Sequence, residues 1–295
     1  MKKKKMLKWL PNPLLIQLLG VILFSVVLIN PGFSGPLELV HFKSYAEILG
    51  SSAADSDSSP DLFPIWGHLG RPEGKGPFPA VILMHGCGGI RPPHFQWAGI
   101  LNELGYVTLT IDSFRPRNTL RVCNNFARVT SPPQRALDAY GGLSFLQSQA
   151  YVIPDRVGVI GWSHGGIAVL HAVNRSGVSA RFKQQFKAAA TFYPWCMTDR
   201  SFEIPLLILI GESDNWTPAE LCESLSDHSK NAVSGIPLEL VVYPNAHHSF
   251  DDPQVKIPYL LEDALGKKRL LKYDQDAHLD SIKRIEIFLE KNLAE

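Results

Sequence analysis

Short apolar runs that alternate with helical patterns are the feature that most restricts the fold of this chain. From Pro79 onward, we expect strands at 80–84, 106–111, 157–160, 188–192, 206–210 and 238–242. We expect helices at 95–104, 133–149, 166–174, 218–231 and 277–293. Continuous apolar strands alternating with helices indicate an α/β fold, with a mostly parallel central sheet covered by helices on both faces.

Two earlier strands are expected at 37–42 and 62–69, and a Ser/Asp/Ala-rich stretch separates them. This stretch, 50–61, cannot bury much apolar surface, so we interpret it as a flexible, exposed loop and not as a domain boundary. With no internal repeat, residues 35–295 are predicted to form a single α/β domain.

The N-terminus has the layout of a secretory signal. Four lysines follow Met1, and the mostly apolar segment 14–29 follows Lys8. Sixteen residues are short for a spanning helix, which needs about 20 apolar residues. The small residues Gly32 and Ser34 suggest cleavage after Ser34. Residues 1–34 are therefore interpreted as a signal peptide, with an uncleaved membrane anchor as the alternative; in both cases the body is exported, to the periplasm or beyond.

The formal net charge of +1 hides an asymmetry. Five of the 29 basic residues and none of the 28 acidic ones precede residue 35, so the rest of the chain carries a net charge of −4. A nucleic-acid partner would require a clustered basic face, and the body offers none. The positive charge belongs to targeting, and no nucleic-acid partner is expected.

A nucleophile candidate lies in the sequence Gly161-Trp162-Ser163-His164-Gly165, which fits G-x-S-x-G. The motif follows the expected strand 157–160 and leads into the expected helix from Gly166. This is the strand-turn-helix setting of a nucleophile elbow, which exposes a serine hydroxyl at the carboxyl edge of a sheet. The alternative is a serine that only caps a helix.

A serine nucleophile needs a histidine to accept its proton and an acid to orient that histidine. Glu212 and Asp214 follow the expected strand 206–210, and His247 and His248 follow 238–242. Asp214 is favoured over Glu212 because it lies farther into the loop, and the residues alone leave the two histidines open. The order serine, acid, histidine is that of one class of hydrolases.

A glycine-rich turn, His85-Gly86-Cys87-Gly88-Gly89, follows the expected strand 80–84. Such a turn lets a backbone N–H approach an oxyanion, and the second donor is normally the residue after the nucleophile. The predicted oxyanion donors are the N–H groups of Cys87 and His164. His85 is given a structural role. Phosphate binding is disfavoured because no complete phosphate-binding motif is present.

Taken together, these residues resemble the dienelactone hydrolase family of α/β-hydrolases, from about Asp61 to the C-terminus. The segments that carry the resemblance are 76–81, 85–89, 161–166, 211–218 and 248–250. The family pattern H-x-F selects His248 over His247, and the family acid falls on Asp214. The resemblance implies an α/β-hydrolase fold and a Ser163, His248, Asp214 triad.

One departure from the family pattern bears on the substrate. Enzymes that hydrolyse dienelactones use a cysteine nucleophile and a glutamate beside the oxyanion loop, where this chain has Ser163 and Gly86. The resemblance therefore implies a serine esterase and not a dienelactone hydrolase in the strict sense.

The four cysteines allow three pairings. Cys87 and Cys123 lie in loops after neighbouring expected strands, and Cys196 and Cys222 follow two others. Because export permits disulfides, we predict Cys87–Cys123 and Cys196–Cys222, with free buried thiols as the alternative. No zinc motif is present, and no metal is expected.

The sequence thus predicts an exported serine hydrolase that cleaves a small-molecule carboxylic ester without a cofactor. Trp162, Trp195 and Trp216 flank the motif loops and either shape the substrate pocket or pack in the core. The alternatives are an acyl-chain or peptide hydrolase on the same fold, a catalytically silent binding protein, and a membrane-anchored interaction protein.

Overall fold

The structure is a computed structural model that describes residues 37–45, 62–125, 130–198, 200–230 and 238–293. The chain divides into units of residues 1–32 and 33–295, and every described residue belongs to the second. The expected signal or anchor at 1–34 and loop at 50–61 lie outside the described residues. In the described part, no helix is long and apolar enough to cross a membrane.

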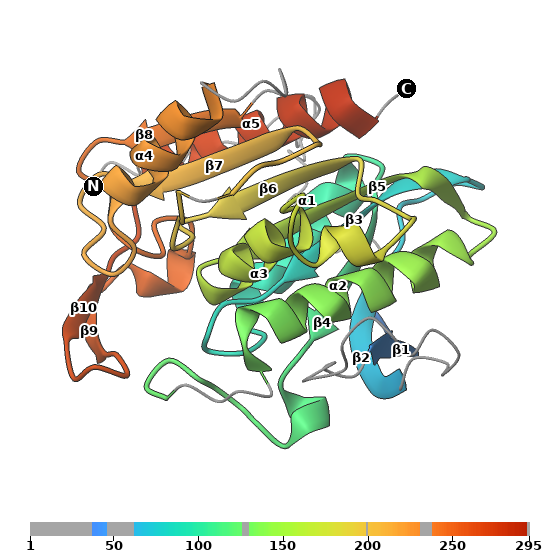
Figure 1. The fold of residues 1–295 in the computed structure, drawn as a ribbon, viewed down its shortest axis with the longest axis horizontal. Helices are drawn as coiled ribbons and strands as arrows, with labels where there is room; N and C mark the ends of the chain where they lie inside the picture. The colour runs from blue at the N-terminus through green and yellow to red at the C-terminus, as the bar shows by residue number, and fades with distance from the viewer. Residues whose placement is uncertain (1–36, 46–61, 126–129, 199, 231–237, 294–295) are drawn as a thin grey trace, which may run out of the picture. The chain divides into compact units, whose positions relative to one another are not determined.

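Eight strands form one sheet in the order β1-β2-β4-β3-β5-β6-β7-β8 (Figure 1). The strands are β1 (Glu38–Tyr45), β2 (Leu62–Gly70), β3 (Phe78–Met84), β4 (Val107–Asp112), β5 (Val152–Trp162), β6 (Ala188–Phe192), β7 (Leu206–Gly211) and β8 (Leu238–Tyr243). β2 is antiparallel to both of its neighbours, and β4, β3, β5, β6, β7 and β8 pair in parallel. The mostly parallel α/β fold predicted from the sequence is confirmed.

Helices cover both faces of this sheet. They are α1 (Pro92–Glu103), α2 (Pro132–Gln147), α3 (His164–Ala172), α4 (Ala219–Lys230) and α5 (Gln275–Leu293). Gly142 of α2 lies against Ile82 of β3, so Ile82 and its partner Val159 of β5 face α2. Gly158, the residue before Val159, lies against Leu289 of α5. Because successive residues of a strand face opposite sides, α2 and α5 lie on opposite faces.

The central strands are apolar along their whole length because helices cover both faces. Every residue of β4, β6 and β7 is buried, which explains why these strands read as continuous apolar runs instead of alternating ones. Since parallel strands end at the same edge, the loops after β3, β5, β7 and β8 meet there, at the edge where this class of fold places its sites.

The observed elements differ from the predicted ones at a few boundaries and in one addition. β5 begins at Val152 and not at residue 157, and α3 begins at His164 and not at residue 166. A hairpin of β9 (Tyr259–Glu262) and β10 (Lys268–Leu271) was not predicted. Its strands have four residues each, and only one of these eight residues is buried, so they leave no clear apolar pattern.

Candidate active site

Ser163 lies on a sharp turn between β5 and α3. Its backbone has φ 52° and ψ −116°, a left-handed conformation that costs a residue other than glycine about 1–3 kcal/mol. The flanking glycines are needed because the chain is crowded. A Cβ at Gly161 would lie 2.4 Å from the Gly165 oxygen, and one at Gly165 would lie 2.0 Å from the Met84 oxygen. The expected nucleophile elbow is thus formed.

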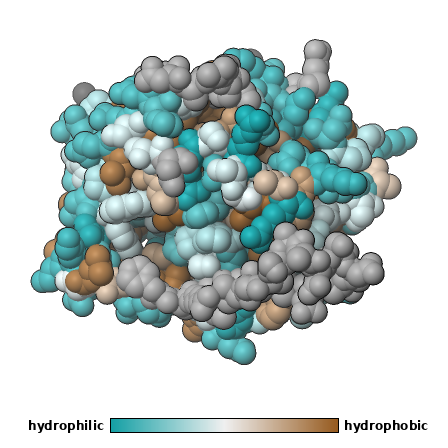
Figure 2. Space-filling view, in the orientation of Figure 1, coloured by the Kyte–Doolittle hydropathy of each residue, from teal (hydrophilic) through white to brown (hydrophobic). Residues whose placement is uncertain are grey.

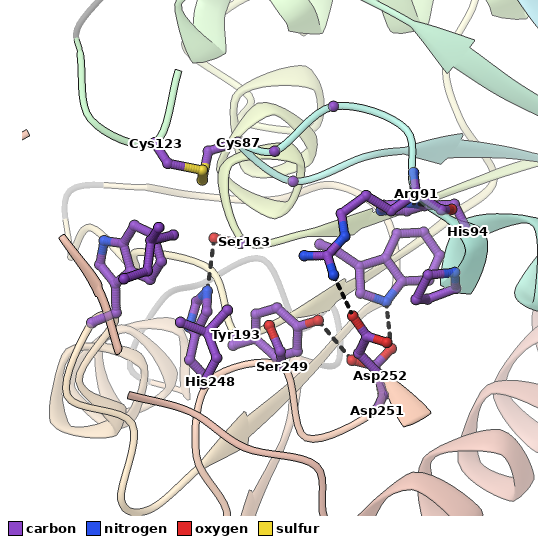
Figure 3. Close-up of a pocket in the computed structure, with 18 of the residues that line it drawn as sticks. Cys87, Arg91, His94, Cys123, Ser163, Tyr193, His248, Ser249, Asp251 and Asp252 are labelled. Atoms are coloured by element: carbon purple, nitrogen blue, oxygen red, sulfur yellow. Dashed lines mark hydrogen bonds and ion pairs between the residues drawn. A yellow bond between two sulfur atoms is a disulfide. The ribbon is translucent and has the colours of Figure 1, made fainter. Parts of the chain in front are cut away.

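The structure brings together the three residues of the predicted triad (Figure 3). Ser163 Oγ lies 2.9 Å from His248 Nε2, and His248 Nδ1 lies 2.7 Å from Asp214 Oδ2. The carboxylate accepts only, so Nδ1 carries the proton and Nε2 is left to accept from the serine hydroxyl. This is the arrangement in which a histidine can act as a general base toward a serine.

Asp214 is buried and held by donors from its own loop. Its Oδ1 accepts from the N–H groups of Trp216 (2.8 Å) and Thr217 (2.9 Å), and the Thr217 hydroxyl lies 2.9 Å from Oδ2. Burial alone would raise the pKa of Asp214, but His248 and these donors outweigh it, so the pKa is lowered. The carboxylate therefore stays ionised beside the histidine.

The alternative acid, Glu212, and the alternative histidine, His247, lie outside the contact between Ser163, His248 and Asp214. Glu212 is exposed and accepts from the backbone N–H of Asn245 at 2.9 Å. His247 is only half-buried, and its Nδ1 has no hydrogen-bond partner among the described residues. Among the described residues, neither side chain hydrogen-bonds to Ser163 or His248.

The glycine-rich turn after β3 lies beside Ser163. A Cβ at Gly86 would be 3.7 Å from the Ser163 Cβ, so the position where the resemblance places a glutamate faces the serine. Among the described residues, the N–H groups of Cys87 and His164 donate to no other atom. Both are backbone donors next to the serine, as an oxyanion site requires.

The turn is fixed by a disulfide between Cys87 and Cys123, and Val122 N donates to the Cys87 oxygen at 2.8 Å. A second disulfide joins Cys196, in the loop after β6, to Cys222 of α4. The structure therefore contains both predicted disulfides. Figure 3 shows the first beside Ser163.

Arg135 of α2 connects the two elements that carry the predicted oxyanion donors. Its Nη1 donates to His164 Nδ1 at 2.7 Å, and its Nη2 donates to the His85 oxygen at 2.5 Å. The side chain is fully buried and makes no ion pair with a carboxylate of the described residues. Burial lowers its pKa to about 9, so the guanidinium remains charged at neutral pH. Burial, together with Arg135, lowers the pKa of His164 to about 3, and this imidazole is neutral.

Asp251 is a second buried group that the sequence did not reveal. It is 1% exposed and accepts from Trp97 Nε1 (2.9 Å), Trp162 Nε1 (2.7 Å) and the Tyr193 hydroxyl (2.6 Å). Burial, reinforced by Asp251, raises the pKa of Tyr193 far above its usual value, so the phenol keeps its proton and donates. The only sequence signal is the position of Asp251, three residues after His248.

Two cavities meet at Ser163. The small cavity has a volume of about 80 Å³ and the large cavity about 530 Å³. Trp216 and the Cys87–Cys123 disulfide line both. Of the other tryptophans flanking the motifs, Trp162 is a core residue that also lines the small cavity, and Trp195 lines the large one.

The β9–β10 hairpin forms part of both walls. Tyr259 and Leu271 line the small cavity, and the segment from Asp263 to Arg269 lines the large one. Leu271 also forms a bridge with His248, and Lys272 N donates to the His248 oxygen at 3.1 Å. Among the described residues, no group of three or more His, Cys, Asp or Glu is placed to hold a metal ion.

A serine after a strand, with an acid and a histidine after later strands of a mostly parallel sheet, defines an α/β-hydrolase. The chain belongs to the dienelactone hydrolase family, whose model matches residues 65–293. The resemblance seen in the sequence is confirmed.

Relatives and solved structures agree with this family and fold. The chain is 28% identical over 200 residues to a Bradyrhizobium sp. protein named "Probable 2-oxo-3-(5-oxofuran-2-ylidene)propanoate lactonase", covering 63% of this chain and 78% of that one. A dienelactone hydrolase-like promiscuous phosphotriesterase from metagenomic libraries superposes with a TM-score of 0.62 at 20% identity, over 88% of this chain and 99% of that one. Esterase 2 of Thermogutta terrifontis, phosphorylated by paraoxon, gives 0.59 at 18% identity, over 90% and 98%.

Proposed function

We propose that this protein is a serine esterase that hydrolyses a carboxylic ester through an acyl-enzyme. The observation that supports this most directly is the continuous contact from Ser163 Oγ through His248 to Asp214, with distances of 2.9 and 2.7 Å. The serine opens onto two cavities, so a substrate can reach it from outside. The family is one of hydrolases.

In the first half of the proposed reaction, His248 Nε2 takes the proton of Ser163 as Oγ attacks the ester carbonyl carbon. The N–H groups of Cys87 and His164 donate to the oxyanion that forms. The bond to the alcohol oxygen then breaks, and His248 gives its proton to that oxygen. Asp214 stabilises the imidazolium between these two transfers.

In the second half, water attacks the acyl carbon and its proton passes to His248. The bond to Ser163 Oγ breaks, the proton returns to this oxygen, and the acid is released. Each step uses water and side chains of this chain, so the proposal includes no cofactor.

We also propose that the chain is exported, through a signal peptide or an N-terminal anchor at 1–34, and that residues 35–295 act as one domain. Two disulfides support an oxidising compartment. Fractionation and N-terminal sequencing of the exported protein test this. A chain that stays in the cytoplasm would contradict export, and an intact Met1 would favour the anchor.

Active-site labelling tests the esterase proposal. A fluorophosphonate should label the wild type and not Ser163→Ala, and the same substitution should abolish hydrolysis of an ester panel. Ser213→Ala is the matched control, because Ser213 is an exposed serine in the neighbouring loop. Labelling that survives in Ser163→Ala defeats the mechanism. Labelling without ester turnover would favour the acyl-chain or peptide hydrolase, and the absence of both would favour a binding protein.

A further inference from the structure

The two cavities that meet at Ser163 differ in size and chemistry. The large cavity is lined by side chains from the loop after β4, from α3 and from the loop after β6. Its apolar lining includes Val122, Ile167, Trp195 and Leu265. Among the described residues, the charged side chains of its lining are Asp263, Lys267 and Arg269, all from the β9–β10 hairpin, where Arg269 is paired with Asp263 at 2.7 Å. Such a cavity suits an apolar group.

Two apolar side chains of the large cavity are exposed at the surface. Leu265 is 68% exposed on the hairpin turn, and Trp195 is 45% exposed in the loop after β6. Figure 2 shows hydrophobic side chains at the surface at the lower left, where Figure 1 places the hairpin. The entrance on this side is therefore bordered by apolar side chains as well as by the charged hairpin residues Lys267 and Arg269.

Several polar side chains line the small cavity (Figure 3). Arg91 and Asp252 lie on its wall with an N–O distance of 3.4 Å, and Tyr193, Ser249 and Tyr259 are among the other polar residues of the lining. Because the arginine is already paired with a carboxylate, the cavity offers no unpaired cation for an anionic group. A volume of about 80 Å³ leaves room only for a short group.

The position of His248 orients an ester between these cavities. His248 lines the small cavity, whereas the large cavity is lined by His164 and Ile167 on the other side of the serine. The leaving oxygen must lie beside His248 Nε2 to receive its proton. The alcohol therefore leaves through the small cavity, and the acyl group extends into the large one.

We propose that the substrates of this enzyme are esters of a bulky apolar acid with a short alcohol. The proposal rests on the esterase function proposed above. It assigns the large cavity to the acyl group and the small cavity to the alcohol, with Ile167 and Tyr259 limiting the size of each.

Isomeric esters test the assignment because they differ only in which side of the ester is large. Methyl octanoate and heptyl acetate form one pair, and methyl phenylacetate and benzyl acetate form another. The expected kcat/KM is higher for the methyl ester of each pair by about tenfold or more, within the range that one or two misplaced methylenes cause. Equal rates, or a preference for the acetates, overturn the proposal.

Substitutions that change one cavity at a time sharpen the test. Ile167→Trp should lower kcat/KM for methyl octanoate about tenfold more than it lowers kcat/KM for methyl acetate. Tyr259→Ala should raise kcat/KM for heptyl acetate relative to methyl octanoate. Leu260→Trp adds the same indole to an exposed hairpin residue that lines neither cavity, and should change neither series.

The outcomes separate this proposal from the esterase function. Fluorophosphonate labelling of Ser163 together with a preference for large alcohols overturns the cavity assignment alone. A serine that is not labelled and an enzyme that hydrolyses no ester overturn both. If Ile167→Trp affects methyl acetate as strongly as methyl octanoate, Ile167 does not line the acyl site and the assignment fails.

Discussion

Trp162 Nε1 donates to Asp251 Oδ2 at 2.7 Å and thereby joins the residue before Ser163 to the loop that carries His248. The two are 89 residues apart in sequence. Because Trp97 and Tyr193 donate to the same carboxyl group, one buried side chain connects α1, the end of β5, the loop after β6 and the histidine loop.

Removing this acceptor is expected to destabilise the protein strongly. Asp251→Ala leaves two buried indole N–H groups without an acceptor and should lower the free energy of unfolding by about 3–5 kcal/mol. Asp251→Asn should cost only about 1 kcal/mol, since its amide can donate to the Tyr193 oxygen. Urea unfolding measures both. Asp252→Ala is the comparison, because Asp252 pairs with a partly exposed arginine and caps the turn at Gln254, and its loss should cost only about 1–2 kcal/mol. Equal costs for the two alanine variants would refute the role of the network.

Asp214→Ala should lower kcat about 10⁴-fold for methyl phenylacetate, because His248 loses the group that fixes its tautomer. Glu212→Ala, two residues earlier, is the matched control and should stay within about threefold. Steady-state kinetics of both variants decide between the two acids. A larger loss in Glu212→Ala would mean that the structure pairs His248 with the wrong carboxylate.

Arg135→Met should lower kcat about 10–100-fold with little change in KM. The substitution removes a buried charge and the hydrogen bonds that hold His164 and the chain before Cys87. Under the proposed mechanism, the N–H groups of His164 and Cys87 stabilise the oxyanion only in the transition state, so kcat should fall and KM should change little. Arg135→Lys keeps the charge and should recover part of the loss. The inhibition constant of a boronic acid should rise in parallel with the fall in kcat/KM. A rise in KM with unchanged kcat would indicate a merely structural role.

The two disulfides should contribute similarly to stability and differently to activity. Their sequence separations of 36 and 26 residues predict that replacing either pair by serine lowers the free energy of unfolding by about 3–4 kcal/mol. Only the Cys87/Cys123 pair holds a predicted oxyanion donor, so only its removal should lower kcat, by about tenfold. Kinetics below the unfolding transition test this, and equal kcat values for the two double variants would speak against the assignment.

His94 makes the stability of the fold depend on pH. Burial lowers its pKa to about 4, below the ordinary value of about 6.5 that it regains on unfolding. The unfolded chain therefore binds more protons between these values, and the free energy of unfolding falls as the pH falls from about 6.5 to about 4. His94→Gln should reduce this slope by about 1.4 kcal/mol per pH unit. Urea unfolding at several pH values measures it, with His228→Gln, at an exposed site, as the control that should leave the slope unchanged.

The main sheet and the loops that carry Ser163, Asp214 and the two histidines could be predicted because each depends on local sequence, whereas the choice of His248 over His247 required the family pattern H-x-F. Apolar runs locate the strands, and the order of loops after parallel strands places the three side chains at one edge. The disulfides follow from the same reasoning, since cysteines after neighbouring strand ends lie close together.

Arg135 and Asp251 could not be predicted in this way. Arg135 reads as an ordinary polar residue of a helix, and its partner His164 is 29 residues away. The role of Asp251 depends on three donors from other elements, namely the indole N–H groups of Trp97 and Trp162 and the hydroxyl of Tyr193. A buried polar network is defined by neighbours in space, and a single sequence contains no pattern that pairs them.

The β9–β10 hairpin has a consequence for how this enzyme can change over evolution. Its tip borders the large cavity, which we propose holds the acyl group, whereas its base at Leu271 bridges to His248. Mutations can accumulate at the tip and alter which acids are accepted without moving the reacting atoms. Mutations at the base would shift His248 and are therefore less tolerated. We expect relatives with different substrates to differ first at the tip of the hairpin and only later at its base.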